Sequence, residues 1–234
     1  MRPKKLTPSL KKQVDLLRYY ARKISELDKI QGWNEFYRIH DRTDPVTWES
    51  WARIKRALKR LRPDDCLDDA GGYFSIVLLS KLCPDVVLKI SPNKRSDNGW
   101  LYMKWARRQT DSLSPMIYDQ FGDSRIEFAI MERLVSDASQ VEDEDSRAKA
   151  RDAWFKGMDM GELYGSKYMK RVHRAFNFAY DDLAWENVLY RQDGSLVITD
   201  PVAGSKSGPR DKSSTRHSYR KRRQGMIRSL KAAA

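Results

Sequence analysis

Two aspartates and an asparagine near the C-terminal end are spaced in a way that suits phosphoryl transfer. Asp182 and Asn187 form a D-x-x-x-x-N pattern, and Asp200 follows the apolar run at 196–198. Transfer of a phosphoryl group needs a carboxylate beside the attacking hydroxyl and oxygen ligands for magnesium ions on the phosphates. The spacing therefore predicts Asp182 as the catalytic base, with Asn187 and Asp200 as metal ligands.

The segment between these metal ligands is typical of a hairpin. Residues 188–190 and 196–198 are apolar, and the turn pair Asp193-Gly194 lies between them. Such a hairpin brings its two ends together, so Asn187 and Asp200 are expected to reach one metal site. The alternative is an ordinary hairpin with solvated carboxylates. The combined pattern, with an upstream lysine, favours the phosphoryl-transfer site.

The upstream lysine lies in the apolar segment 86–90. Lys89 is costly to bury in such a strand without a partner, so we expect it to bind the phosphates of a nucleotide. The segment before it offers backbone N–H groups for the same phosphates. Its predicted nucleotide-binding residues are Gly71, Gly72, Tyr73, Phe74 and Ser75. The alternatives are an edge-strand lysine that faces water and a plain glycine turn.

A third part of a nucleotide site is predicted by position alone. In a two-lobed nucleotide-binding fold, the segment that joins the lobes would pass the adenine ring. The residues at this place in the sequence are Met131, Glu132 and Leu134. There the main chain would hydrogen-bond the base, with Met131 packing behind it. The predicted cofactors are therefore ATP and magnesium.

Several of these motifs together resemble a known family. The phrase Ile-Thr-Asp-Pro-Val at 198–202, the Gly-Tyr-Phe-Ser loop at 72–75 and the lysine strand resemble the early serine/threonine protein kinase of T7-like bacteriophages, over residues 64–202. The resemblance implies phosphorylation of host proteins early in infection, including the transcription and RNA-processing machinery. RNA polymerase is accordingly one expected partner, and a host transcription shut-off activity is implied only for sequence beyond the kinase part.

The chain also departs from ordinary kinases. Kinases pair the strand lysine with a glutamate on the following helix, but residues 99–108 contain no glutamate. Asp97 is an alternative partner for the lysine. Ala184 stands where many serine/threonine kinases carry a lysine, and Asp181 rather than arginine precedes the predicted base.

The composition predicts a soluble, basic protein. The 234 residues are 40% hydrophobic and 33% charged, with a mean hydropathy of −0.74. No apolar run of about 18 residues occurs, so no membrane partner is expected. Two cysteines cannot form a disulfide framework, and three scattered histidines argue against a structural zinc. We therefore expect a cytoplasmic protein.

The net charge of +13 is concentrated at the two ends. Residues 1–62 hold 17 basic and 7 acidic side chains, residues 63–202 hold 18 and 24, and residues 203–234 hold 10 and 1. The excess positive charge, which could attract a binding partner, therefore lies outside the predicted catalytic core. Weak contact with nucleic acid through the basic tail is one expected use of it.

The expected architecture is an α+β, reduced bilobal kinase-like fold in four parts. Residues 1–62 form a basic helical extension, 63–134 an N-lobe with an antiparallel sheet, 135–202 a minimal helical C-lobe with the catalytic loop, and 203–234 a flexible basic tail. Expected helices span 8–31, 45–61, 99–108, 146–157 and 160–179, and expected strands span 73–80, 85–91 and 126–131.

Two other functions compete with a protein kinase. A small-molecule phosphotransferase would use the same three polar residues, but its closed site would not need basic, flexible flanks. A catalytically weak kinase-like scaffold would instead bind RNA polymerase or nucleic acid through its basic ends, with the run at 220–223 as its strongest feature. Neither the oligomeric state nor the role of the N-terminal helices follows from the sequence.

Overall fold

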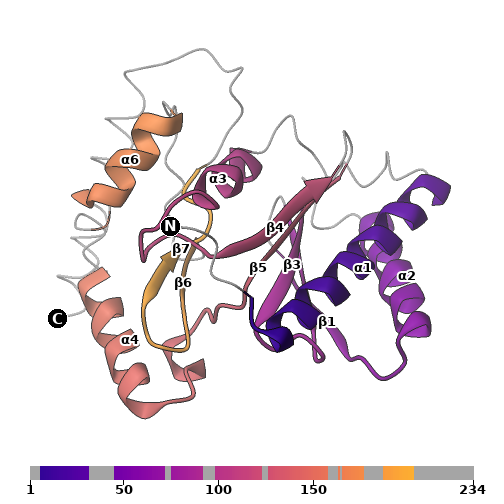
Figure 1. The fold of residues 1–234 in the computed structure, drawn as a ribbon, viewed down its shortest axis with the longest axis horizontal. Coiled ribbons are helices and arrows are strands. Elements are labelled where there is room, and N and C mark those ends of the chain that lie inside the picture. The colour runs from indigo at the N-terminus through magenta and orange to yellow at the C-terminus, as the bar shows by residue number, and fades with distance from the viewer. Residues whose placement is uncertain are drawn as a thin grey trace.

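A five-stranded antiparallel sheet with helices on both faces forms the centre of the molecule (Figure 1). A separate two-stranded hairpin follows it in the chain. The computed structural model describes residues 6–31, 45–71, 75–91, 98–122, 126–157, 163, 165–176 and 187–202. The predicted α+β class is confirmed. Within those residues, no helix has the length and apolar character needed to cross a membrane.

The sheet has the order β1-β2-β3-β5-β4 with all pairs antiparallel. Its strands are β1 (Leu67–Gly71), β2 (Ile76–Ser80), β3 (Val86–Ser91), β4 (Ile117–Gly122) and β5 (Glu127–Glu132), and helix α3 (Asn98–Ala106) connects β3 to β4. The strands expected at 85–91 and 126–131 and the helix expected at 99–108 are present, with ends shifted by up to two residues. The strand expected from residue 73 is described only from Ser75 onward.

The two strands that the sequence did not predict are the edges of this sheet, β1 and β4. Strand β1 carries the adjacent pair Asp68 and Asp69, and β4 has a register shift between Ile117 and Asp119. Charged residues and bulges are common on edge strands because they discourage pairing with other chains. They also remove the apolar alternation by which a strand is predicted.

Side chains of the central strand β3 alternate between two cores. Val86, Leu88 and Ile90 belong to the core beneath helix α1 (Pro8–Gln31), whereas Val87 belongs to the core on the other face. We call these the outer and inner cores. Lys89 falls between Leu88 and Ile90, so it lies on the inner face with Val87. The period of two in the strand thus directs the lysine away from α1.

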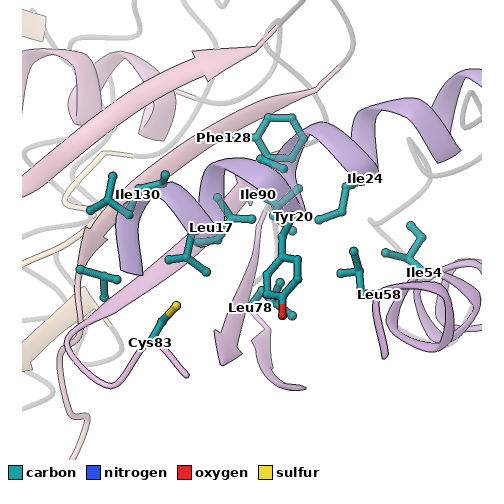
Figure 2. Packing of buried hydrophobic residues seen from close by; sticks show 14 of the residues in the cluster. Leu17, Tyr20, Ile24, Ile54, Leu58, Leu78, Cys83, Ile90, Phe128 and Ile130 are labelled. Carbon is teal, nitrogen blue, oxygen red and sulfur yellow. The ribbon is translucent and has the colours of Figure 1, made fainter. Parts of the chain in front are cut away.

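The N-terminal helices cover the outer face of the sheet (Figure 2). Helices α1 and α2 (Pro45–Leu61) have the bounds predicted from the sequence. The buried residues that α1 and α2 contribute to the outer core are Val14, Leu17, Tyr20, Ala21, Ile24, Ile54 and Leu58. Leu61, the last residue of α2, has an exposed fraction of 43%.

Replacing Leu17 with alanine is expected to destabilise the fold by about 2–5 kcal/mol, because the removed atoms leave a cavity in the outer core. Urea denaturation followed by circular dichroism measures the change, with the exposed Lys12→Ala as the matched control. A loss no larger than that of the control would show that α1 does not pack on the sheet.

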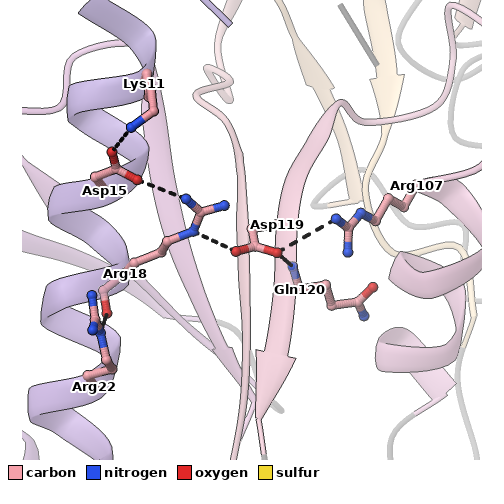
Figure 3. Close-up of polar contacts among 7 residues, drawn as sticks. All are labelled: Lys11, Asp15, Arg18, Arg22, Arg107, Asp119 and Gln120. Carbon is pink, nitrogen blue, oxygen red and sulfur yellow. Dashed lines mark hydrogen bonds and ion pairs between the residues drawn. The ribbon is translucent and has the colours of Figure 1, made fainter. Parts of the chain in front are cut away.

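A chain of charged groups also joins α1 to the other edge of the sheet (Figure 3). Asp119 of β4 accepts a hydrogen bond from Arg18 Nε at 2.7 Å and lies 3.6 Å from a guanidinium nitrogen of Arg107, just after α3. Arg18 also binds Asp15 within α1 at 2.8 Å. These side chains are partly exposed, so the chain of charges orients the helices more than it stabilises them.

The C-terminal part contains a short 3-10 helix η2 (Ala138–Gln140), helices α4 (Glu144–Gly157) and α6 (Lys167–Phe176), and strands β6 (Val188–Tyr190) and β7 (Leu196–Ile198). Asp143 caps α4 by accepting a hydrogen bond from Ser146 N at 2.8 Å, which lowers the pKa of its carboxyl. Helix α4 therefore begins two residues before the predicted start. The helix expected at 160–179 is described over α6, and residues 177–179 lie outside the described part.

The turn of the hairpin is anchored on α4. Gly194 has a φ of +75°, and a Cβ at this position would collide with the carbonyl oxygen of Ser146. Lys149 donates a hydrogen bond to Asp193 O at 2.9 Å. Glycine is required here both for its backbone conformation and for the close approach of the helix. The hairpin is thus held at its turn while its open end carries the polar residues.

Candidate functional site

The open end of the hairpin brings the two predicted metal ligands together. Val188 pairs with Ile198 across the two strands, and the next backbone pair continues the ladder with Thr199 N donating to Asn187 O at 2.8 Å. Asp200 follows directly. The prediction that this hairpin joins Asn187 and Asp200 at one end is therefore confirmed.

The hairpin packs against the inner face of the sheet. Val188 and Ile198 share the inner core with Val87 of β3 and Met131 of β5. The other buried members of that core are Tyr102, Met103, Ala106, Ile117, Leu163, Tyr168, Met169, Val172 and Val202. Residues from α3, α6 and the hairpin thus meet on one face, and their burial fixes the distance between the sheet and Asp200.

Two buried tyrosines hold the second hairpin strand in place. Tyr102 of α3 donates a hydrogen bond to Ile198 O, and its hydroxyl lies 2.6 Å from that of Tyr168 on α6. Burial raises the pKa of Tyr168 to about 12 and that of Tyr102 well above its ordinary value. Both phenols therefore stay neutral at physiological pH and remain able to donate. The pair fixes the strand two residues before Asp200.

The catalytic lysine predicted from the sequence reaches the predicted metal ligand. Lys89 Nζ lies 3.2 Å from Asp200 Oδ2, and the Lys89 side chain is only 9% exposed. These residues are 111 positions apart in the chain. A buried charge is stable only when paired, so the contact explains how an apolar strand tolerates a lysine.

The residues present fit a magnesium site. The second carboxylate oxygen, Asp200 Oδ1, is buried and accepts no hydrogen bond within the described part of the chain. Magnesium is commonly bound by one or two carboxylates together with substrate phosphates and waters. No cluster of three His, Cys, Asp or Glu side chains able to hold a metal occurs among the described residues. Asp200 and an oxygen of Asn187 would therefore need phosphate oxygens to complete the coordination.

An ion pair that the sequence analysis did not predict joins the hairpin to the end of β5. Arg191 Nε lies 2.8 Å from Glu132 Oε2, and the second guanidinium nitrogen lies 2.8 Å from Glu132 Oε1. The same guanidinium donates to Ser112 O at 2.6 Å and to Ser114 O at 2.8 Å. This two-pronged pair fixes the sheet, the loop after α3 and the hairpin against one another. No local pattern in the sequence predicts this ion pair, because Glu132 and Arg191 are 59 positions apart.

The predicted adenine-contacting residues lie at the same junction. Met131 is buried in the inner core, and the Glu132 side chain is occupied by Arg191. The N–H of Glu132 donates to Met116 O, and that of Arg133 donates to Asp85 O. Within the described residues, no hydrogen bond uses the Leu134 N–H. That main-chain groups at this junction, in particular the Leu134 N–H, hydrogen-bond a base therefore remains a prediction.

The remaining predicted site residues are described only in part. Gly71 ends β1, and the buried Ser75 precedes β2. Gly72, Tyr73 and Phe74, which form the rest of the predicted phosphate loop, lie outside the described residues, as do Asp97 and the predicted base Asp182. Their roles stay predictions.

Comparisons with known proteins give distant structural neighbours. No protein-family model matches the sequence, and no curated protein is significantly similar to it. One similar solved structure is Rad53 1–466 in complex with AMP-PNP, with 16% identity and a TM-score of 0.35 over 64% of this chain and 43% of that chain. Another is the Cydia pomonella granulovirus kinase PK-1, with 16% identity and a TM-score of 0.38 over 68% of this chain and 61% of that chain. The chain thus spans less than two thirds of either structure, and the function of neither transfers to it.

Proposed function

We propose that this chain is an ATP- and magnesium-dependent serine/threonine protein kinase. The observation that carries the proposal is the partly buried contact between Lys89 and Asp200 at 3.2 Å, which joins the lysine strand to the end of the hairpin. The sequence assigns Lys89 to the nucleotide phosphates and Asp200 to the magnesium on those phosphates. Lys89 is not a surface lysine paired by chance, because its side chain is 9% exposed and lies on the inner face.

Each residue of the site has a defined part in the proposed reaction. Lys89 binds phosphate oxygens of ATP, and Asp200 with Asn187 holds magnesium. When bound, the metal neutralises charge on the phosphates. Asp182 orients the attacking hydroxyl and accepts its proton. The inner core excludes water around Lys89, which strengthens its interaction with the phosphates. The rate gain is then mainly positional and electrostatic.

A protein substrate fits the charge distribution better than a small molecule does. The basic side chains are concentrated in residues 1–62 and 203–234, outside the site. A polyanionic or acidic macromolecule would meet these ends before its hydroxyl reaches Asp182. The resemblance to the early kinase of T7-like bacteriophages supports host transcription and RNA-processing proteins as the substrates, in the host cytoplasm.

Replacing Asp182 with asparagine tests the proposed role of this residue as base. Turnover is expected to fall by about 10²–10⁴-fold, because the hydroxyl loses its proton acceptor, while folding and nucleotide binding remain. Transfer of labelled γ-phosphate to casein measures the rate, with the exposed Asp145→Asn as control. A variant that keeps more than about a tenth of the wild-type rate would contradict the assignment. Absence of transfer by the wild-type protein would instead favour the scaffold function.

A further inference from the structure

The proposed reaction leaves Lys89 in need of a second carboxylate. In the described structure its ammonium group is paired with Asp200. Once Asp200 holds magnesium, its oxygens are shared with the metal, and the lysine loses part of that interaction. Protein kinases meet this need with a glutamate from the helix after the lysine strand. Helix α3 reads NGWLYMKWA and contains no acidic residue.

Few buried carboxylates are candidates for this second partner of Lys89. Among the described residues, the acidic side chains that are buried are Asp65, Glu127 and Glu132. Asp65 lies at the outer core, where it accepts hydrogen bonds from Tyr20 and Ser80. Glu132 is at the end of β5 with Arg191. Glu127 is the one that the strand places on the same face as Lys89.

The register of β3 and β5 determines this placement. Lys89 is opposite Ala129, and Ser91 is opposite Glu127, one step along the same face. Phe128 and Ile130 point to the outer core, so Glu127, Ala129 and Met131 point to the inner one. Side chains at such diagonal positions have Cβ atoms about 7–8 Å apart or less, within reach of two long side chains.

A close backbone approach shapes the surroundings of Glu127. Gly122 of β4 is its cross-strand partner, and a Cβ at Gly122 would lie 2.7 Å from Glu127 Cα and 3.2 Å from its Cγ. A larger residue at Gly122 would collide with the backbone at Ile126 and Glu127. Glu127 itself is 1% exposed, so its charge acts through little solvent. A carboxylate held in this way interacts strongly with a nearby ammonium group.

We propose that Glu127, on strand β5, is the positioning residue that holds Lys89 toward the nucleotide phosphates while Asp200 binds magnesium. It takes the place of the helix glutamate that this chain lacks. The inference rests on the proposed kinase function and adds a residue to its site. Glu127 touches neither phosphate nor metal in this role, and it acts only through the lysine.

Binding of AMP-PNP with magnesium, measured by calorimetry, tests the inference. Glu127→Gln is expected to weaken binding about tenfold and to lower kcat, whereas Glu127→Asp, which keeps the charge, should lose much less. The exposed Glu142→Gln is the matched control and should bind as the wild type does. Because Glu127 acts through Lys89, Glu127→Gln should cause no further loss when added to Lys89→Met.

The outcomes separate this inference from the function on which it rests. Wild-type protein that fails to bind AMP-PNP with magnesium would overturn both. Wild-type binding combined with unchanged binding in Glu127→Gln would overturn the role of Glu127 alone. Equal losses from Glu127→Gln in the wild-type protein and in the Lys89→Met variant, or equal losses for the Gln and Asp variants, would also overturn it. If Glu127→Gln does not fold, the same cycle is run with Glu127→Asp, and full additivity with Lys89→Met is then the contradicting result.

Discussion

Replacing Asp200 with alanine is expected to lower kcat/KM for phosphoryl transfer by about 10²–10³-fold, the scale of losing one preorganised electrostatic group. Two effects act together. The variant loses the buried oxygen that fits magnesium, and it leaves the Lys89 side chain, which is 9% exposed, without the carboxylate that it contacts. Binding of the magnesium nucleotide should weaken as well, since a proposed metal ligand has been removed.

Kinetics over a range of magnesium concentrations measure this effect. The midpoint of the magnesium dependence should move to higher concentration in Asp200→Ala and stay in place in Asp145→Ala, whose side chain is exposed on α4. If the midpoint does not move, magnesium is bound elsewhere, and the placement of Asn187 and Asp200 at one end of the hairpin has only a structural meaning.

Replacing Arg191 with methionine is expected to cost about 3–5 kcal/mol of folding stability, because Glu132 would be left as a buried charge without its partner. The carbonyls of Ser112 and Ser114 would lose their donor in the same step. Loss of the pair should also loosen the hairpin from the sheet and so displace Asp200. Activity at low temperature should therefore fall along with stability.

Urea denaturation of Arg191→Met and of the exposed Arg174→Met gives the comparison. The double variant Arg191→Met, Glu132→Leu should recover part of the loss, since no uncompensated charge remains buried. A loss equal to that of Arg174→Met would mean that the pair is no stronger than an exposed ion pair.

The sheet connects the N-terminal helices to the candidate site. Helix α1 packs on the alternate residues of β3 and β5 that face the outer core, while the neighbouring residues face the inner core. A strand buried on both faces cannot shift along its length without moving every side chain to the wrong face. The extension therefore stabilises the register that places Lys89, in addition to covering apolar surface.

Much of this molecule followed from local sequence patterns. The bounds of α1, α2 and the two hairpin strands agree with those predicted, because a helical stripe or a short apolar strand beside a turn is visible within a few residues. Strands β3 and β5 were also predicted from the local sequence, because they are largely apolar on both faces. The order of polar residues along the chain likewise predicted which of them would meet at the hairpin end.

The edge strands and the charged contacts were decided by the tertiary structure. Strands β1 and β4 have only one neighbour each, so their stability comes from pairing with β2 and β5 rather than from their own composition. The surroundings of Glu132 and Glu127 depend on their places along β5 and, for Glu132, on Arg191, 59 residues later in the chain. A carboxylate is buried only where a distant chain segment supplies its partner, and local periodicity carries no information about that segment.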